Sequence, residues 1–417
     1  MSTQWHIFSD HQPRDLGSLG NAVAVDLLFL TDVLPLRRTP SGFATRYASI
    51  IRRLCELGTT TLHVALRTSN PALRHPVADI AAQMYAELPR LSHFVLSVHD
   101  PLAGHRLVRG VRRNVLGYPS SSLPEVPGSY RITSRLVVAQ PGLAHLALNR
   151  CRSSTVYLLE EGFERRSKVL GHPIRSRLKY PFDSLNLRRL YRRISTTGMP
   201  VVVLTDHERN FFSSWIRKEN IHVVPLSIDL SAYDHSPPRR RGNGERDFTV
   251  GVVGRLGDPR NQAPLRALLQ VADDAGASWR ILLVGLGSET YASWQDRASH
   301  PTIEITGFVD EVAPWYRELD CALVPETLVT GSKTSVLQAW AAGVPCVCSE
   351  AAARSCDVRD GEDGLVYADE HAALAAVERI RADADLAERL TRQGRQRVQE
   401  HDAASSAARV VALLGTP

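Results

Sequence analysis

The chain has 417 residues, of which 43% are hydrophobic and 23% charged. This composition excludes an intrinsically disordered chain, and the length predicts two domains, because single hydrophobic cores seldom grow beyond about 250–300 residues. The formal net charge of +6 comes almost wholly from arginine, since Lys168, Lys179, Lys218 and Lys333 are the only lysines. An arginine bias of this kind is weak evidence for nucleic-acid binding.

The amino-terminal half alternates short apolar runs with helical patterns. The run AVAVDLLFL, 22–30, predicts a buried strand, and a loop with Pro40 and Gly42 leads into a helix expected over 43–57. Further strands are expected in TLHVAL, HFVLSVHD, RLVVAQ, STVYLLE, PVVVLTD and IHVVPLSID. Such alternation is typical of a parallel sheet covered by helices.

Residues 236–247 combine Pro, Gly and charge without an apolar period, and we predict that they form a linker. A second series follows, with strands expected in FTVGVVGRL, RILLVGLG, IEITGFV, CALVPE, PCVCSE and GLVYAD. The predicted fold class is α/β, with two doubly wound Rossmann-like domains at 1–235 and 248–400 and the active site in the cleft between them. A final helix, 401–417, is expected to pack near the domain junction.

The six cysteines show no CxxC pair and no companion histidines at metal-ligand spacing. They indicate reduced, mostly buried thiols in a cytoplasmic protein, and Cys346 with Cys348 would share one face of a strand without making a zinc site. The first residues include acidic side chains and no apolar signal segment, and no run of 18 apolar residues occurs. We expect neither a cleaved signal peptide nor a membrane-spanning helix.

Two arginines stand at the end of the strand in FTVGVVGRLGDPRN. Arg255 follows Gly254 directly, and Arg260 lies in the next loop. Two guanidiniums at the carboxyl end of a strand suit a pyrophosphate, with solvated loop arginines as the alternative.

Glycines end the next two strands. Gly285 and Gly287 supply only half of a dinucleotide fingerprint, which favours a tight turn over an NAD site. Gly307 would let the backbone approach a nucleobase beside Phe308 and Val309, and a glycine turn with its own hydrophobic cover is equally compatible with the sequence.

The stretch GSKTSVLQAWAAGVPCV, 331–347, carries the strongest signal. Gly331, Ser332 and Thr334 can present amides and hydroxyls at a helix start, where the helix dipole and Lys333 add positive charge. A phosphate suits this position, and Gln338 could reach ribose hydroxyls. An ordinary capped and buried helix is the alternative.

The order GRLGDPRN, LLVGLG, ITGFVDE, CALVPE, TGSKTSVLQAWAAGVPCV and DGEDGLVY resembles the carboxyl-terminal half of family-four glycosyltransferases of the GT-B fold (glycosyl transferases group 1). The resemblance spans roughly residues 248–400. The amino-terminal half fits more loosely, through the PSGFATR loop and VVPLSID.

The resemblance implies roles for particular residues. Arg255 and Arg260 would hold the diphosphate of a nucleotide sugar, and Gly307 to Val309 would lie along the base. The amides of Gly331 to Thr334 would cap the phosphates, and Gly42 would approach them from the other domain. Catalysis would stabilise the departing diphosphate through Arg255, Arg260, Lys333 and the helix amides.

The chain departs from the family pattern at two places. Thr330 and Gln338 replace two glutamates, so the donor sugar is open. Glu160 or Glu161 stands at a strand end where many members have a histidine facing the reacting sugar. These glutamates are candidate catalytic residues, with a solvated helix start as the alternative.

The predicted activity is a retaining transfer, without a metal or other cofactor, from a UDP- or GDP-linked sugar co-substrate, with a small hydrophilic natural-product intermediate as acceptor. A cell-envelope glycan or glycolipid acceptor is an alternative, and so is an inactive nucleotide-sugar-binding scaffold. Epimerase, phosphorylase and nicotinamide oxidoreductase activities rank lower. The basic tract within 165–193 could contact anionic lipid, but peripheral membrane contact is not favoured, and nucleic acid is not an expected partner.

Overall fold

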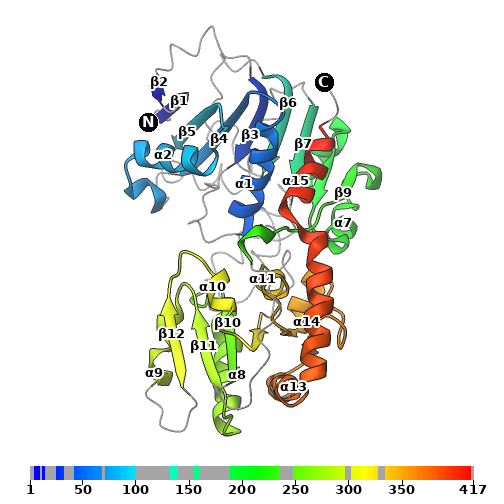
Figure 1. The fold of residues 1–417 in the computed structure, drawn as a ribbon. Coiled ribbons are helices and arrows are strands. Elements are labelled where there is room, and N and C mark those ends of the chain that lie inside the picture. Colours follow the sequence, from blue (N-terminus) through cyan, green and yellow to red (C-terminus); the bar gives the residue numbers. More distant parts are fainter. Residues whose placement is uncertain are drawn as a thin grey trace, which may run out of the picture. The chain divides into compact units, whose positions relative to one another are not determined.

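The computed structural model describes residues 4–9, 12–14, 25–31, 42–67, 71–99, 132–139, 154–159, 188–233, 248–295, 302–326 and 334–414. The chain forms two compact units (Figure 1). The amino-terminal unit comprises Met1–Pro225 with Ala403–Pro417, and the carboxyl-terminal unit comprises Leu226–Asp402. The predicted linker, 236–247, lies outside the described residues.

The amino-terminal unit is built on a nine-stranded sheet of order β2-β1-β5-β4-β3-β6-β7-β8-β9. The strands are β1 (Gln4–Ser9), β2 (Gln12–Arg14), β3 (Val25–Thr31), β4 (Thr60–Arg67), β5 (His93–His99), β6 (Ile132–Ala139), β7 (Ser154–Leu158), β8 (Val201–Val203) and β9 (Ile221–Val223). From β5 to β9 every neighbouring pair is parallel, which confirms the sheet type expected from the apolar runs.

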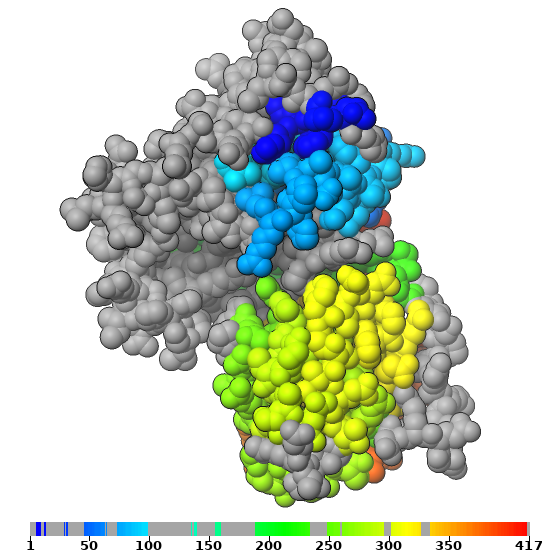
Figure 2. Space-filling model, turned by 90° about the vertical axis from the view of Figure 1, so that its left-hand side faces the viewer, coloured from blue at the N-terminus to red at the C-terminus, as the bar shows by residue number. Residues whose placement is uncertain are grey.

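Two antiparallel strands at one edge were not predicted. β1 pairs antiparallel with both β2 and β5. Figure 2 shows β1 and β2 in dark blue beside the lighter blue α2 (Val77–Glu87), and the Tyr85 hydroxyl of α2 donates a hydrogen bond to the Phe8 carbonyl of β1 over 3.1 Å. The apolar pattern of β1 is too short to indicate a strand by itself. Its pairing partner β5 lies far along the chain, so the local sequence gives no sign of the pairing either.

Helices cover one face of this sheet through a shared core. α1 (Gly42–Cys55), α2 and α15 (Ala403–Ala412) bury aliphatic and aromatic side chains against the strands, and α1 lies beside α15 (Figure 1). The remaining helical segments in the described part of this unit are η2 (Pro71–Arg74), residues 188–197, α7 (Asp206–Phe212) and η3 (Lys218–Asn220). The last helix of the chain therefore folds with the amino-terminal unit.

The carboxyl-terminal unit contains a six-stranded parallel sheet of order β12-β11-β10-β13-β14-β15. The strands are β10 (Thr249–Val253), β11 (Arg280–Val284), β12 (Ile303–Gly307), β13 (Cys321–Val324), β14 (Cys346–Ser349) and β15 (Leu365–Tyr367). All six correspond to the apolar runs in the sequence. The predicted α/β fold class is confirmed.

Helices pack on both faces of this second sheet. They are η4 (Leu230–Ala232), α8 (Pro259–Asp274), η5 (Ser288–Tyr291), α9 (Ala292–Gln295), α10 (Ala313–Tyr316), α11 (Thr334–Ala342), α12 (Glu350–Cys356), α13 (Glu370–Ala382), α14 (Ala384–Val398) and η6 (Gln399–His401). α8 and α13 share a core with alternate residues of the strands. Asp369 and Asp383 cap the amino termini of α13 and α14.

Trp340 joins α11 to its neighbours. Its buried indole Nε1 donates to the carbonyl oxygen of Asp363 over 2.7 Å, and a Cβ on Gly394 of α14 would lie 2.4 Å from the ring Cδ1. A glycine is needed at position 394 because the indole occupies the space of a side chain.

We expect Trp340→Phe to lower the free energy of unfolding by about 2–3 kcal/mol, because the variant leaves a buried carbonyl without its donor and a small void. Trp279→Phe is the matched control. The Trp279 indole donates to the half-exposed Glu378 carboxylate over 2.8 Å, which water can solvate instead. Urea unfolding followed by circular dichroism compares the two, and an equal loss in both would contradict the role of Trp340.

His401 ties together two segments of the carboxyl-terminal unit that are distant in sequence. Its Nδ1 lies 2.8 Å from the Leu226 carbonyl oxygen, and its own carbonyl accepts from the Ile228 amide over 3.0 Å. Since Nδ1 must donate to a carbonyl, the neutral ring carries its proton there. Burial is the main effect and lowers the pKa of His401. The hydrogen bond to the Leu226 carbonyl and the charge of Glu400 act to raise this pKa, and Arg397 lowers it further, so the net shift is downward.

The low pKa of His401 predicts a pH dependence of stability. Below a pH of about 6.5 the unfolded chain binds a proton at this histidine that the folded chain does not. Stability is therefore fully present above that pH and falls as the pH drops towards the folded-state pKa. We expect His401→Gln to lose less stability than the wild type between pH 7.5 and 5.5 in urea titrations, and parallel losses would contradict this prediction.

Candidate functional site

The strand order of the carboxyl-terminal unit creates a switch point. The chain starts at β10, adds β11 and β12 on one side, and then returns to place β13 on the other side of β10. The loops after β10 and β13 therefore diverge, and α/β sheets bind ligands at the carboxyl ends of strands at such a point. The first loop contains Gly254 and Arg255, and the second leads to α11.

The glycines at the carboxyl ends of β10 and β11 let the backbones of neighbouring loops touch. Gly285 has a φ of +120°, and a Cβ there would lie 2.2 Å from the Gly254 carbonyl oxygen. A Cβ on Gly287 would lie 2.3 Å from the Gly257 Cα, and the Gly254 amide donates to the Val284 carbonyl over 2.9 Å. The predicted turn at Gly285 and Gly287 is thus an interlocked pair of loops.

Gly307 ends β12 with a φ of +72°. Its amide donates to the buried Ser288 hydroxyl over 2.9 Å, and its carbonyl accepts from the Gly285 amide over 3.0 Å. Both backbone groups of Gly307 are thus held by neighbouring loops. Phe308 is 47% exposed and Val309 is half-buried, so these two residues offer the accessible surface after β12.

Arg255 lies in the loop after β10 with an exposed side chain. Its carbonyl oxygen accepts hydrogen bonds from the Asn261 amide nitrogen Nδ2 over 3.1 Å and from the Asp258 backbone N–H over 3.2 Å. Among the described residues its guanidinium has no acidic partner, which leaves it available to an anion. Arg260 is the second residue of α8, and its side chain is not among those described.

The helix α11 begins at Thr334 and contains Gln338, as the sequence predicts. Residues 330–333, which include Lys333 and the predicted phosphate-binding amides, lie outside the described residues. In chain order, α11 is the first described element after β13, the strand that lies next to β10 at the switch point.

Two tyrosines lie beside the Gln338 side chain. The Tyr316 hydroxyl donates its proton to the Ser335 carbonyl over 3.1 Å, and it lies 3.4 Å from Gln338 Oε1. The Gln338 amide acts to lower the pKa of Tyr233, which places it near that hydroxyl. Burial raises the pKa of both tyrosines well above the usual value of 10. Both hydroxyls therefore stay protonated throughout the physiological range.

Tyr233, Tyr316 and Glu326 were not singled out by the sequence. Tyr316 lies in the short helix α10, and Glu326 follows β13 at the switch point, where its charge helps to raise the pKa of Tyr316. An acidic residue directly after a predicted strand was a signal for Glu326. The two tyrosines gave no comparable signal, because each occurs in an ordinary apolar pattern.

The cysteines of the described residues are free thiols, as expected. Cys346 and Cys348 share one face of β14, with 3.6 Å between their sulfur atoms. The hydrogen bond to Cys346, together with burial, raises the pKa of Cys348, which makes it an unreactive core residue. No group of three or more metal-ligating side chains occurs within the described part of the chain.

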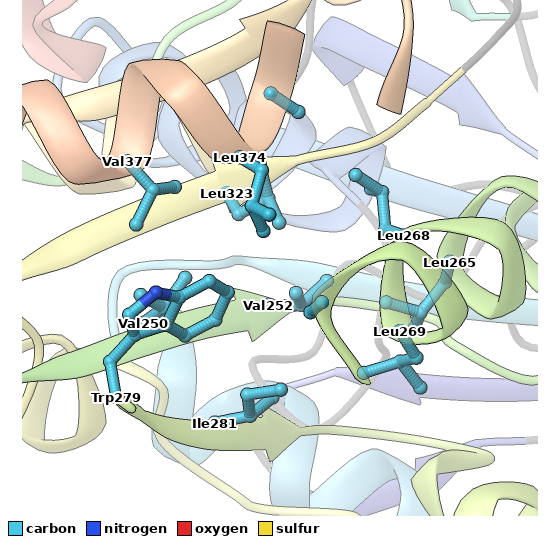
Figure 3. Close-up of a pocket in the computed structure, with 12 residues that line it drawn as sticks. Val250, Val252, Leu265, Leu268, Leu269, Trp279, Ile281, Leu323, Leu374 and Val377 are labelled. Carbon is cyan, nitrogen blue, oxygen red and sulfur yellow. The ribbon is translucent and has the colours of Figure 1, made fainter. Parts of the chain in front are cut away.

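A cavity of about 20 Å³ lies away from the strand ends, between the sheet, α8 and α13 (Figure 3). The side chains that point into it are apolar and include Val250, Val252, Leu268, Trp279, Leu323 and Val377. Such a space is a gap in the core, since it offers no polar partner to a nucleotide or even a water molecule.

The predicted site residues of the amino-terminal unit are only partly described. Gly42 is the first residue of α1. Glu160 and Glu161 come after Leu159, the residue that follows β7, and they lie outside the described residues. Their roles remain predictions. No helix among the described residues is long and apolar enough to cross a membrane.

The glycine loops and α11 all lie in one segment of the sequence that matches a known protein family. Residues 247–383 match the model of a family described as glycosyl transferases group 1. This segment makes up most of the carboxyl-terminal unit, which is therefore similar to group 1 glycosyltransferases. No curated protein sequence matches the chain.

Solved glycosyltransferase structures share the fold of the whole chain. Sucrose-phosphate synthase from Thermosynechococcus elongatus is 16% identical, with a TM-score of 0.64 over 93% of this chain and 98% of that chain. HepE of Anabaena, solved with UDP and glucose, is 15% identical, with a TM-score of 0.65 over 94% and 100%. A glycosyltransferase from Rickettsia africae is 12% identical, with a TM-score of 0.63 over 95% and 100%. These likenesses confirm the predicted GT-B fold, and the family match confirms the predicted resemblance of residues 247–383 to glycosyl transferases group 1.

Proposed function

We propose that the carboxyl-terminal unit is a group 1 glycosyltransferase domain that binds a nucleoside diphosphate sugar at the carboxyl ends of β10, β11 and β12 and at the start of α11. The main support is the switch point itself, where Gly254 follows β10, a Cβ built on Gly254 would meet no atom within 4 Å, and the neighbouring Arg255 is exposed. HepE, which has the same fold, was solved with UDP and glucose.

The proposed chemistry is electrostatic. As the sugar leaves, negative charge builds on the diphosphate, and Arg255, Arg260, Lys333 and the amides from Gly331 to Thr334 would stabilise it. Three fixed cations and a helix terminus can offset that charge, so we propose a transfer that needs no metal. Gly42 and one of the glutamates, Glu160 or Glu161, would approach the donor from the amino-terminal unit.

Three finer assignments belong to this proposal. The transfer retains the anomeric configuration, as the resemblance to family-four enzymes implies. Phe308 and Val309 lie along the base, because they carry the accessible surface after β12. The acceptor is a small hydrophilic molecule bound by the amino-terminal unit, and the protein acts in the cytoplasm.

Calorimetric titration of the full chain with UDP and GDP, each with magnesium and with EDTA, tests the proposal. We expect one of the two to bind at micromolar concentration and equally in both conditions. Binding only with magnesium would contradict metal independence, and no binding of either would contradict the proposed donor site. Release of nucleoside diphosphate from the matching sugar nucleotide then separates an active enzyme from an inactive scaffold.

A further inference from the structure

The helix formed by residues 188–197 of the amino-terminal unit carries its arginines on one side. Its apolar side chains are buried, and they are Leu190, Tyr191 and Ile194. The exposed arginines, which we call the arginine face, are Arg188, Arg189, Arg192 and Arg193. Positions 188 and 192 lie one turn apart, as do positions 189 and 193, so the four side chains leave the same side of the helix.

An aromatic cluster from α7 and the turn after it borders the arginine face. The Cζ atom of Arg188 lies 5.5 Å from the centre of the Trp215 ring. The Trp215 ring also packs against Phe211 and Tyr191, with ring centres 5.0 and 5.9 Å apart. Trp215 and Phe211 are half-buried, so each presents part of its ring beside the arginines. α7 packs next to β9, the last strand of the nine-stranded sheet (Figure 1).

Few acidic side chains offset the charge of this surface. From the helix at 188 to the end of η3 the sequence contains seven arginines and lysines against three aspartates and glutamates. Glu208 is buried and accepts a backbone hydrogen bond over 2.8 Å, so its carboxylate faces the core. Asp206 pairs with Arg209, and Glu219 lies 3.6 Å from Arg217. The segment therefore keeps an excess of positive charge.

The make-up of this surface favours a lipid bilayer over other anionic partners. Single-stranded nucleic acids stack their bases on open aromatic faces, and the Trp215 ring is already covered by Arg188 on one side. A stable protein interface needs a desolvated apolar centre. The exposed large apolar side chains of the described residues, Leu57, Leu286 and Phe308, lie elsewhere. Lipid headgroups need neither feature, because their phosphates accept hydrogen bonds from guanidiniums and indole rings favour the headgroup region.

We propose that the arginine face, bordered by Trp215 and Phe211, docks the protein on a membrane surface that carries anionic lipid. The arginines bind headgroup phosphates, and the half-buried rings reach the headgroup region. The sequence by itself does not favour membrane contact, because a run of arginines can equally be a solvated helix face. The added observation is the aromatic border, which a separate element supplies. The inference concerns the amino-terminal unit and does not depend on the proposed nucleotide site.

Co-sedimentation of the full chain with lipid vesicles tests the proposal. One set of vesicles is phosphatidylcholine alone, and the other contains a quarter of phosphatidylglycerol. Each arginine near an anionic bilayer strengthens binding about fivefold, so we expect the wild type to bind the anionic vesicles about 100-fold or more tightly than the neutral ones. Arg189→Gln/Arg192→Gln should weaken binding to the anionic vesicles about 25-fold. High salt should release the wild type from them.

Arg389→Gln/Arg392→Gln is the matched control. Both arginines are exposed on α14 in the carboxyl-terminal unit, and their removal changes the net charge by the same amount. This variant should bind the anionic vesicles within about twofold of the wild type, because salt screens exposed charges that lie away from the contact. Arg189→Lys/Arg192→Lys keeps the charge and should retain most of the binding. Should the glutamine double variant fail to fold, Arg192→Gln alone should weaken binding about fivefold.

Three results would overturn the proposal. The first is a wild type that does not bind the anionic vesicles, or binds the neutral vesicles equally well. The second is an equal loss in the two glutamine double variants, since the net charge and not the arginine face would then be responsible. The third comes from a fluorescein-labelled oligothymidylate. If the wild type binds it more tightly than the anionic vesicles, and Arg189→Gln/Arg192→Gln abolishes that binding, the surface is a nucleic-acid site.

Discussion

Replacing Lys333 with alanine is expected to lower kcat/KM for glycosyl transfer by about 10²- to 10³-fold, the loss typical when one preorganised charge-stabilising contact is removed. Lys333 directly precedes α11, so its ammonium group would add a full charge to the partial positive charge of the helix start. The charge on the departing diphosphate grows as the bond to the sugar breaks. The rate should therefore fall more than the affinity for the nucleoside diphosphate. Release of nucleoside diphosphate from the sugar nucleotide measures the rate.

Two further variants control this prediction. Lys333→Arg keeps the charge and should retain most of the activity, whereas a purely steric role would make both variants similar. Lys218→Ala removes a lysine from η3 in the amino-terminal unit, where the side chain is exposed, and should leave the rate unchanged. Full activity in Lys333→Ala would contradict the role of this residue.

Gly285→Ala is expected to lower the free energy of unfolding by about 3 kcal/mol or more and to abolish nucleotide binding. The new Cβ would lie 2.2 Å from the Gly254 carbonyl oxygen, and a φ of +120° is itself strained for alanine. A backbone atom cannot move aside as a flexible side chain can, so the loops after β10 and β11 must separate. Those loops carry Gly254 and Arg255, which explains the expected loss of binding.

Gly276→Ala isolates the contribution of the clash. Gly276 also has a positive φ, of +61°, but a Cβ there would meet no atom within 4 Å. We expect a cost of about 1–2 kcal/mol and normal nucleotide binding. Tryptophan fluorescence in urea reports mainly on the carboxyl-terminal unit, because four of the six tryptophans, Trp279, Trp294, Trp315 and Trp340, belong to it. Equal losses in the two variants would show that the loops are not interlocked.

The sheets could be predicted because their strands are buried parallel runs of β-branched and aliphatic residues. Each apolar run from β10 to β15 is separated from the next by a helical pattern. The hydrophobic periodicity and the order of these runs were therefore enough to predict the strands of a parallel sheet. The antiparallel edge strands β1 and β2 lack this signal, because their pairing depends on contacts distant in sequence. The sequence likewise does not indicate that α15 belongs to the amino-terminal unit, because this depends on contacts with residues distant in sequence.

The candidate site was predictable where chemistry follows directly from a strand end. Arg255 follows β10 at the switch point, Gly307 ends the edge strand β12, and Gln338 lies within α11. The tyrosine contacts of Gln338 could not be predicted, since they join η4, α10 and α11 through side chains that look like ordinary core residues. The interlocking of Gly285 with Gly254 required the three-dimensional approach of two loops.

Hydrogen–deuterium exchange of the full chain, with and without saturating UDP or GDP, tests the central claim most directly. The account predicts slower exchange in peptides that cover 254–258, 307–309 and 331–338, and unchanged exchange in α13. Protection confined to other segments, or none despite saturation, would show that the nucleotide is not held at the switch point of the carboxyl-terminal unit.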